Sequence, residues 1–405
     1  QPARRDGAGG QAHAPRRAAA CRMSGAPPRV LILTASYGSG HTRAAGILAE
    51  EFRRAGAVPT VVDHFRDLVH PAFDRWSRAL YYELLRRAPA VWGGAYWLGD
   101  RIHVGSPLLL GFNHLGADNL RSMLRAERFD QVVSVQPTPA GALSYLRSRG
   151  EAIPPHTTVF TDFVAHTQWI HPHVDRYCVP AEEISHELTA RGLPRENVVV
   201  TGIPVAPEFL EQPERAAARL SLGLSPRLPV LLFMDGAGGG FGRLEEAARA
   251  VLAMEQPAFQ AVFVVGHSRA LEARLRRLAS GHERRVKVFG FVDHVRTMMA
   301  AADILVTKAG GLTLAEALAA ELPVICFGSL PGQEQRNERF AAMTGVGLVA
   351  GSGAQLQRVI VATLRDPGLL KSIRDRIRLY RRVHAAEEIV GLVLGDGSLA
   401  RERAS

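Results

Sequence analysis

Short apolar runs alternate with amphipathic stretches along most of the chain. In the first half, runs of strand length occur at residues 30–33, 60–62, 131–135, 157–160 and 176–179. In the second half, a similar series occurs at residues 230–234, 261–265, 287–289, 304–306 and 324–327. Short continuous apolar runs separated by helical patterns are typical of parallel strands that helices cover on both faces. The two series therefore predict an α/β chain with two Rossmann-like, doubly wound domains.

The predicted boundary between these domains lies in a proline-rich segment. Pro204, Pro207 and Pro213 are clustered there, as in a linker. The first residues of the chain are rich in Arg, Ala, Gly and Pro and lack periodicity, which predicts disorder. The chain is thus divided into a disordered N-terminal tail, an N-terminal domain, a C-terminal domain and a final tail, at residues 1–28, 29–205, 206–390 and 391–405.

One segment, residues 66–128, is mostly helical in pattern and breaks the alternation of strands and helices. It contains three of the four tryptophans and three of the seven tyrosines, and nine arginines are interleaved with six acidic residues. Aromatic and basic residues on amphipathic helices are typical of the membrane interface. We therefore predict that this segment contacts a membrane or a lipid through Trp76, Tyr81, Trp92 and Trp97. The alternative is an ordinary helical insertion whose aromatic side chains are core.

Composition and charge narrow the class of protein. The chain has 405 residues, of which 47% are hydrophobic and 22% are charged, as expected of a globular protein. No apolar run reaches the roughly 18 residues of a spanning helix, and no signal-peptide core stands near the start. Three cysteines without metal-binding spacing favour a reducing cytosol. The net charge is +10, but the first 22 residues carry +4 of it, which disfavours a nucleic-acid binder.

Two loops that follow strands of the first half carry candidate chemistry. Gly38 and Gly40 precede His41 at a helix start, where backbone N–H groups favour an anion or a polar oxygen. Asp162 and His166 follow another strand, where α/β folds place ligand-binding groups. His41 or Asp162 could take a proton from a hydroxyl group. Alternatively, His41 bonds a loop carbonyl and Asp162 caps the next helix.

The first glycine loop is a poor match to two common phosphate-binding motifs. No Gly-Lys-Ser/Thr follows it, so it is not a Walker A loop. Arg43 stands where the third glycine of a dinucleotide fingerprint would be.

The strongest pattern lies in the second half of the chain. Gly310, Gly311 and Thr313 open a helix directly after a strand, which offers backbone N–H groups and a hydroxyl to an anion. Glu316 lies on the same side of the first turn as Thr313, where its carboxylate could take the two hydroxyls of a ribose. The alternative is a capping box formed by Thr313 and Glu316.

Two further loops of the second half suit a sugar nucleotide. The glycine run that contains Gly238 and Gly239 would let the backbone approach a phosphate, or it is a plain flexible turn. Gln333 and Glu334 follow the next strand and suit sugar hydroxyls. The sequence has no Asp-x-Asp pair, which a metal-held diphosphate usually needs, so we predict no metal site. Helix dipoles and backbone amides would then stabilise a leaving phosphate.

Six short motifs occur in an order that resembles one group of glycosyltransferases. They lie at residues 34–41, 161–169, 174–177, 201–204, 308–311 and 331–334. In this order they resemble the processive diacylglycerol glucosyltransferases and the monogalactosyldiacylglycerol synthases. More distantly they resemble the peptidoglycan lipid-II N-acetylglucosaminyltransferase. The resemblance covers about residues 29–390 and implies a GT-B fold, in which two Rossmann-like domains face each other across a cleft.

The resemblance also implies an activity. The chain would be a metal-independent, inverting glycosyltransferase that moves a hexose from a UDP-sugar to diacylglycerol or a related lipid. It would work peripherally at the cytoplasmic face of the membrane, contact the anionic surface, and need no cofactor. The alternatives are transfer to a polyprenyl-type lipid, a UDP-sugar epimerase, and a non-catalytic UDP-sugar sensor.

The resemblance assigns roles to individual residues. It implies that Gly310, Gly311 and Thr313 hold the diphosphate and that Glu316 holds the ribose. Gln333 and Glu334 would hold the sugar, and the backbone around Phe291 and Val292 would meet the uracil. His41 or Asp162 would be the base that activates the acceptor hydroxyl. Acceptor contacts would include Gly38, Gly40 and His166.

Overall fold

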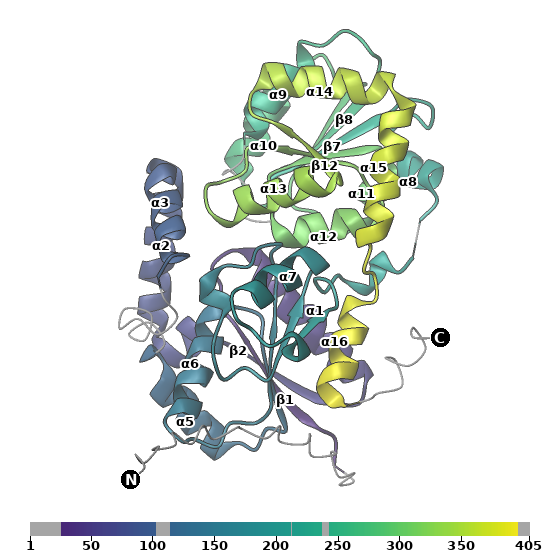
Figure 1. The fold of residues 1–405 in the computed structure, drawn as a ribbon. Coiled ribbons are helices and arrows are strands. Elements are labelled where there is room, and N and C mark those ends of the chain that lie inside the picture. The colour runs from purple at the N-terminus through teal and green to yellow at the C-terminus, as the bar shows by residue number, and fades with distance from the viewer. Residues whose placement is uncertain (1–25, 103–113, 212, 237–242, 396–405) are drawn as a thin grey trace, which may run out of the picture.

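Two parallel six-stranded sheets form the two halves of the molecule (Figure 1). The computed structural model describes residues 26–102, 114–211, 213–236 and 243–395. The N-terminal sheet has the order β2-β1-β3-β4-β5-β6, with β1 (Arg29–Thr34), β2 (Val58–Asp63), β3 (Gln131–Ser134), β4 (His156–Val159), β5 (Arg176–Val179) and β6 (Val198–Val200). The C-terminal sheet has the order β12-β11-β10-β7-β8-β9, with β7 (Val230–Met234), β8 (Gln260–Val264), β9 (Val286–Phe289), β10 (Ile304–Thr307), β11 (Val324–Phe327) and β12 (Gly347–Ala350).

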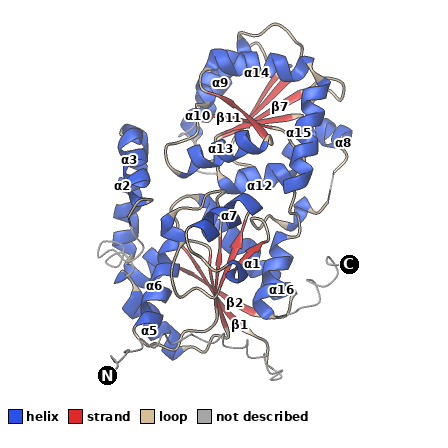
Figure 2. Ribbon diagram, in the orientation of Figure 1, coloured by secondary structure: helices blue, strands red, loops and turns tan. Residues whose placement is uncertain are grey.

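Helices cover both faces of each sheet, as Figure 2 shows. In the N-terminal half these are α1 (Ser39–Arg54), α5 (Ala117–Ala126), α6 (Pro137–Ser148) and α7 (Glu182–Ala190). Helices α2 (Pro71–Arg87) and α3 (Pro89–Gly99) stand beside this half, away from the sheet (Figure 1). The rest are α8 (Arg215–Ser221), α9 (Leu244–Leu252), α10 (Arg269–Leu278), α11 (Val295–Ala301), α12 (Gly311–Ala319), α13 (Gln333–Thr344), α14 (Gly353–Arg365), α15 (Pro367–Tyr380) and α16 (Ala385–Leu394). The predicted pair of doubly wound α/β units is confirmed.

Alternate side chains of one strand enter different cores, which explains the continuous apolar runs. In β7, Leu231 and Phe233 pack with α9, α10 and α14, whereas Val230 and Leu232 pack in the core that contains α11, α12 and α15. Successive side chains of a strand point to opposite faces of the sheet. A strand covered on both faces is therefore largely apolar along its whole length.

Every strand that the sequence predicts is present, but two strands were missed. β6 and β12 each lie at one edge of a sheet, as do β2 and β9, which the sequence did predict. The two missed strands are short: β6 has three residues, and β12 has four and begins with a glycine. Runs of this length do not stand out as separate strands in the sequence.

The chain returns to the N-terminal half at its end. Helix α16 packs against α1, and Arg176 donates a hydrogen bond to the carbonyl of Leu392. One hydrophobic core therefore contains Ile32 of the first sheet, Leu305 of the second and Ile389 of the returning helix. The boundary predicted at residue 390 cuts this helix, because strand–helix alternation does not show where a last helix packs. Residues 1–25 and 396–405 of the predicted tails lie outside the described residues.

Candidate active site

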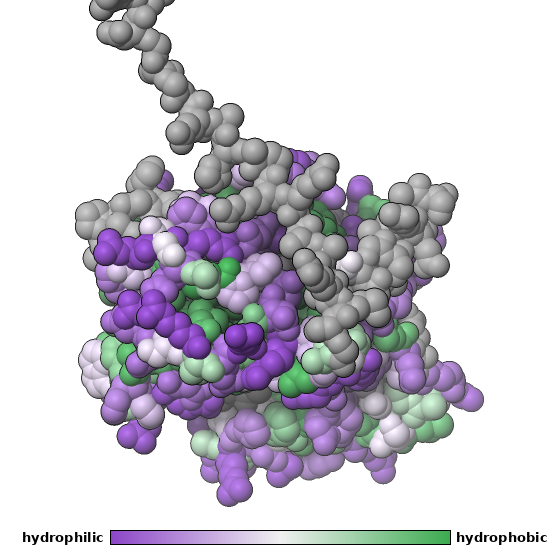
Figure 3. Space-filling view, turned by 90° about the horizontal axis from the view of Figure 1, so that it is seen from below, coloured by the Kyte–Doolittle hydropathy of each residue, from purple (hydrophilic) through white to green (hydrophobic). Residues whose placement is uncertain are grey.

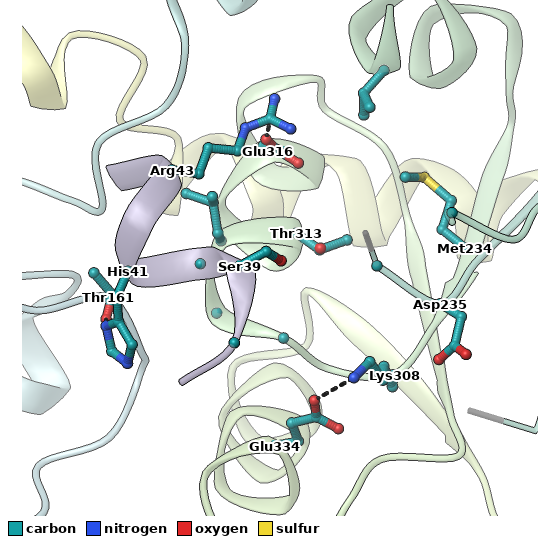
Figure 4. A pocket seen from close by; sticks show the side chains of 18 of the residues that line it. Ser39, His41, Arg43, Thr161, Met234, Asp235, Lys308, Thr313, Glu316 and Glu334 are labelled. Atoms are coloured by element: carbon teal, nitrogen blue, oxygen red, sulfur yellow. Dashed lines mark hydrogen bonds and ion pairs between the residues drawn. The ribbon is translucent and has the colours of Figure 1, made fainter. Parts of the chain in front are cut away.

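A cleft between the two sheets brings together most of the predicted site residues (Figure 4). Its walls are loops at the carboxyl ends of strands, where parallel sheets bind their ligands. The N-terminal half contributes Gly38, Gly40, His41, Thr161 and Asp162. The C-terminal half contributes Phe291, Val292, Gly310, Gly311, Thr313, Glu316, Gln333 and Glu334.

Two helix N-termini face each other in this cleft. Helix α1 begins after Gly38, whose φ of 89° favours glycine, and α12 begins after Gly310. Neither helix is capped by a side chain of its own N-cap residue, although the backbone of Gly311 is hydrogen-bonded to Asp162. The other backbone N–H groups of the two first turns lack helical partners and can bind an anion. A Cβ added at Gly40 would lie 4.0 Å from the Cβ of Leu312, which shows how closely the two helices approach. The alternative that Thr313 caps α12 is wrong, because Gly310 occupies the cap position.

His41 is held in one tautomer by the main chain. Its Nδ1 lies 2.9 Å from the carbonyl oxygen of Val135 and 2.8 Å from Oγ1 of Thr161. A carbonyl oxygen only accepts hydrogen bonds, so we assign the proton to Nδ1 and the lone pair to Nε2. Burial lowers the pKa of His41 to about 4, so the ring is neutral near pH 7. The loop-carbonyl bond considered from sequence is thus present, and it leaves Nε2 as a base.

Asp162 lies between the two halves of the molecule. Its Oδ1 accepts a hydrogen bond of 2.8 Å from Nδ2 of Asn337, on α13. Burial raises the pKa of Asp162 to about 7, although the bonds from Asn337 and the backbone of Gly311 counteract this effect. The capping interpretation is wrong, because His166 caps the 3-10 helix Thr167–Trp169 that follows.

Glu316 is buried and forms an ion pair with a residue of the other half. Its side chain is 4% exposed, and its Oε1 lies 2.9 Å from Nη2 of Arg43 on α1. Figure 4 shows the two side chains pointing toward each other. Burial raises the pKa of Glu316 to about 7, and Arg43 acts in the opposite direction.

A second ion pair lies on the floor of the cleft. Nζ of Lys308 is 3.0 Å from Oε1 of Glu334 (Figure 4). Burial alone would lower the pKa of Lys308, but Glu334 and Asp235 raise it above its ordinary value. Lys308 is therefore a buried cation beside the N-terminus of α12.

The hairpin formed by α2 and α3, residues 71–99, extends from the N-terminal half to the loop before α13 (Figure 1). A Cβ added at Gly93 would lie 2.6 Å from the Cβ of Pro331, and one at Gly332 would lie 3.2 Å from Nε1 of Trp92. The hydroxyl of Tyr81 is hydrogen-bonded to Gln333. The hairpin thus packs directly on the loop that holds the predicted sugar contacts.

The hairpin also contacts the glycine loop before α1. The backbone N–H of Gly38 donates a hydrogen bond of 3.2 Å to the hydroxyl of Tyr82. Tyr37 is hydrogen-bonded to Ser77, on α2. One helical hairpin therefore holds loops of both halves.

The four aromatic residues predicted for the acceptor or membrane separate into two pairs. Trp76 and Trp97 are 62% and 52% exposed, whereas Tyr81 and Trp92 are packed inward against the C-terminal half. The core interpretation thus holds for Tyr81 and Trp92, whereas contact of Trp76 and Trp97 with a membrane stays a prediction. His166 is buried, and its Nε2 lies 3.0 Å from the carbonyl oxygen of Tyr96, so it supports the hairpin from below the cleft.

Sequence reasoning assigned no role to Arg43 or Lys308, which both line the cleft. Both residues stand in motifs that could have drawn attention to them. Arg43 occupies the position of the third glycine in a dinucleotide-binding fingerprint. Lys308 is one of only three lysines in the chain and lies shortly before the Gly310-Gly311 pair. Gly238 and Gly239 lie outside the described residues.

Family models match both halves of the chain. Residues 41–205 match the model for monogalactosyldiacylglycerol (MGDG) synthase, and residues 240–366 match the model for group 1 glycosyl transferases. A processive diacylglycerol beta-glucosyltransferase from Bacillus cereus (strain AH187) is 29% identical over 369 residues, covering 91% of this chain and 94% of that protein. The enzyme of the same name from Bacillus mycoides (strain KBAB4) is 29% identical over 370 residues with the same coverage.

Solved structures share the fold at lower identity. Acinetobacter baumannii MurG has a TM-score of 0.60 at 15% identity and covers 91% of this chain and 100% of its own. The calicheamicin glycosyltransferase CalG4 has a TM-score of 0.60 at 15% identity, covering 92% and 99%. A putative UDP-N-acetylglucosamine 2-epimerase from Listeria monocytogenes has a TM-score of 0.59 at 16% identity, covering 93% and 97%.

The fold, the cleft and the family matches together define a glycosyltransferase with the GT-B fold. Within this class, the predicted resemblance to processive diacylglycerol glucosyltransferases and monogalactosyldiacylglycerol synthases is confirmed.

The close approach of Gly311 to Thr161 leaves no room for a larger side chain at position 311. A Cβ there would lie 2.1 Å from the carbonyl oxygen of Thr161, so Gly311→Ala must push α12 away from the opposite loop. Overpacking of this kind costs roughly 1–3 kcal/mol, and we expect binding of UDP to weaken by about 10- to 100-fold in titration calorimetry. Gly310→Ala is the matched control, because its Cβ would meet only Oγ1 of Thr313, at 3.9 Å. Equal affinities of the two variants would contradict this interpretation.

Proposed function

We propose that the chain is an inverting, metal-independent glycosyltransferase that moves a hexose from a UDP-sugar to diacylglycerol or a related lipid at the membrane surface. The observation that carries the proposal is the cleft itself, in which two uncapped helix N-termini, a buried lysine and a histidine with an open Nε2 converge. The names of the relatives support diacylglycerol as the acceptor class.

The donor is proposed to lie along α12. Backbone N–H groups after Gly310 and the cation of Lys308 are suited to a diphosphate. Glu316, one turn further along the helix, would accept the ribose hydroxyls. Phe291, 54% exposed and stacked on His267, and the backbone of Val292 form the wall proposed for the uracil. Gln333 and Glu334 would take the sugar.

The reaction is proposed to start at His41. Nε2 takes the proton of the acceptor hydroxyl while the oxygen attacks the anomeric carbon, and the bond from that carbon to the diphosphate breaks. The electron pair leaves with UDP, whose added charge the α12 amides and Lys308 stabilise. Asp162 is proposed to position the two halves, since Asn337 occupies its Oδ1. Among the described residues, no group of three or more His, Cys, Asp or Glu side chains is arranged to hold a metal ion.

The hairpin is proposed as the membrane contact, which would place the enzyme peripherally on the cytoplasmic face. Several of its large apolar side chains are exposed, namely Trp76, Leu80, Val91, Trp97 and Leu98. By contrast, the described surface visible in Figure 3 is mostly hydrophilic, with small separate apolar groups. No helix within the described ranges is long and apolar enough to span a bilayer.

The activity is tested by incubating the full chain with radiolabelled UDP-hexoses, with and without vesicles that contain diacylglycerol. Label that enters the organic phase only when diacylglycerol is present is the expected result. Conversion of the UDP-sugar without any lipid acceptor would overturn the proposal in favour of an epimerase.

Replacement of His41 tests the proposed base. We expect His41→Ala to lower kcat by about 10²- to 10⁴-fold, the usual contribution of a positioned general base. UDP affinity should stay unchanged, because His41 faces the acceptor side. Asp162→Asn is the comparison variant: a larger loss of kcat for Asp162→Asn than for His41→Ala would reverse the assignment.

The pH dependence of kcat separates the same two candidates without mutation. The pKa of His41 is about 4, so the ring is already neutral above about pH 5 and kcat should be flat from pH 8 to pH 5.5. The pKa of Asp162 is about 7, so a rate that needed its carboxylate would fall about tenfold per pH unit below that value. The measurement is the rate at saturating donor, and a slope of one below pH 7 would favour Asp162.

Removal of the exposed tryptophans tests the membrane contact. We expect the double variant Trp76→Ser/Trp97→Ser to bind anionic vesicles at least tenfold more weakly, since each indole loses burial in the interface. The matched control is Met343→Ser/Leu379→Ser, which removes side chains that are 74% and 67% exposed elsewhere. Vesicle sedimentation measures both, and equal losses would argue against a hairpin-specific contact.

A further inference from the structure

The ion pair between Arg43 and Glu316 uses the carboxylate proposed for the ribose. It joins α1 of the N-terminal half to α12 of the C-terminal half across the cleft, at 2.9 Å. Oε1 of Glu316, among the residues that the structure describes, lacks a partner with hydrogen-bond geometry. Arg43 and Glu316 therefore attract each other by charge, but the angle between the two groups is unsuited to a hydrogen bond. An oxygen that is buried and only partly satisfied in this way is prepared to exchange its partner.

The Arg43 side chain is much more exposed than that of Glu316. It is 38% exposed, whereas the Glu316 side chain is 4% exposed and lies on a helix buried for most of its length. A second carboxylate, Glu208, lies 3.9 Å from the same Nη2. If the pair separates, the guanidinium is therefore the partner with room to change position.

The N-terminus of α12 is within reach of this guanidinium. Thr313 and Glu316 are three residues apart on α12, so about one turn, or roughly 5 Å, separates them along the helix. Arg43 and Thr313 line the same cleft. A guanidinium binds a phosphate through two parallel hydrogen bonds, which makes a diphosphate at this helix end a stronger partner than Glu316 in its present geometry.

We propose that Arg43 is a displaceable latch: it pairs with Glu316 in the free enzyme and transfers to the donor diphosphate when the ribose takes Glu316. This inference rests on the proposed function, because it assumes a nucleoside diphosphate in the cleft. The exchange brings a cation from the acceptor half, two residues after His41, to the leaving group. In the exchange, the direct contact between Arg43 and Glu316 is replaced by a contact between Arg43 and the diphosphate bound at α12. The two halves thus stay connected, now through the donor.

The latch predicts opposite effects on two ligands. Uridine must break the ion pair and offers no phosphate in return, so Arg43→Ala should bind uridine about two- to fivefold more tightly, as expected for loss of a partly exposed ion pair. UDP loses charge-assisted hydrogen bonds in the same variant. The ratio of UDP affinity to uridine affinity should therefore fall by about 10- to 100-fold. Arg43→Lys keeps the positive charge but lacks the planar guanidinium that makes two parallel hydrogen bonds. Its ratio of UDP affinity to uridine affinity should therefore lie between those of the unmodified chain and Arg43→Ala.

The test measures the affinities of the full chain for UDP and uridine by titration calorimetry. The affinity for uridine is obtained from its competition with UDP. The control is Arg54→Ala, on the same helix, whose ion pair with Glu51 is also 2.9 Å long but lies away from the proposed donor. An unchanged affinity ratio in Arg43→Ala, or equal weakening of both ligands, would overturn the latch while leaving the UDP-sugar donor intact. Failure of the unmodified chain to bind UDP would instead overturn the proposed donor, and the latch with it. Thermal unfolding of each variant identifies any loss of fold.

Discussion

The structure depends on one close approach between its two halves. The first residue of α12, Gly311, lies so near the carbonyl oxygen of Thr161 that no Cβ fits between them. Asn337 reinforces this contact, because its amide bonds Asp162 and its Oδ1 accepts from the backbone of Phe163. Phe163 also stacks on Phe340 of α13. Backbone and rings together set the width of the cleft and place α1 opposite α12.

The α2–α3 hairpin connects the surface of the molecule to this cleft. Its outer face carries exposed tryptophans, while its inner face contacts the glycine loop through Tyr82 and the loop before α13 through Trp92. Arg336 extends the inner contact, since it forms an ion pair with Asp100 and lies over the ring of Tyr96.

Buried charge in the cleft is arranged as pairs that a ligand can replace. Glu316 and Lys308 would each be costly to bury alone, and each has a partner of opposite charge. In the proposed function, a ribose would offer hydroxyls to Glu316, and a diphosphate would offer negative charge to Lys308. The two ion pairs would then compensate these charges until the donor binds.

The sequence by itself determined the two doubly wound sheets, because strands buried on both faces are largely apolar, and it determined the Gly-Gly helix start at 310–311 because such signals are local. It missed β6 and β12, which are only three and four residues long. Only the tertiary structure decided that Arg43 meets Glu316 and that Tyr81 faces inward while Trp76 faces out. These contacts join residues far apart in the chain, and local periodicity carries no information about which distant surface a side chain meets.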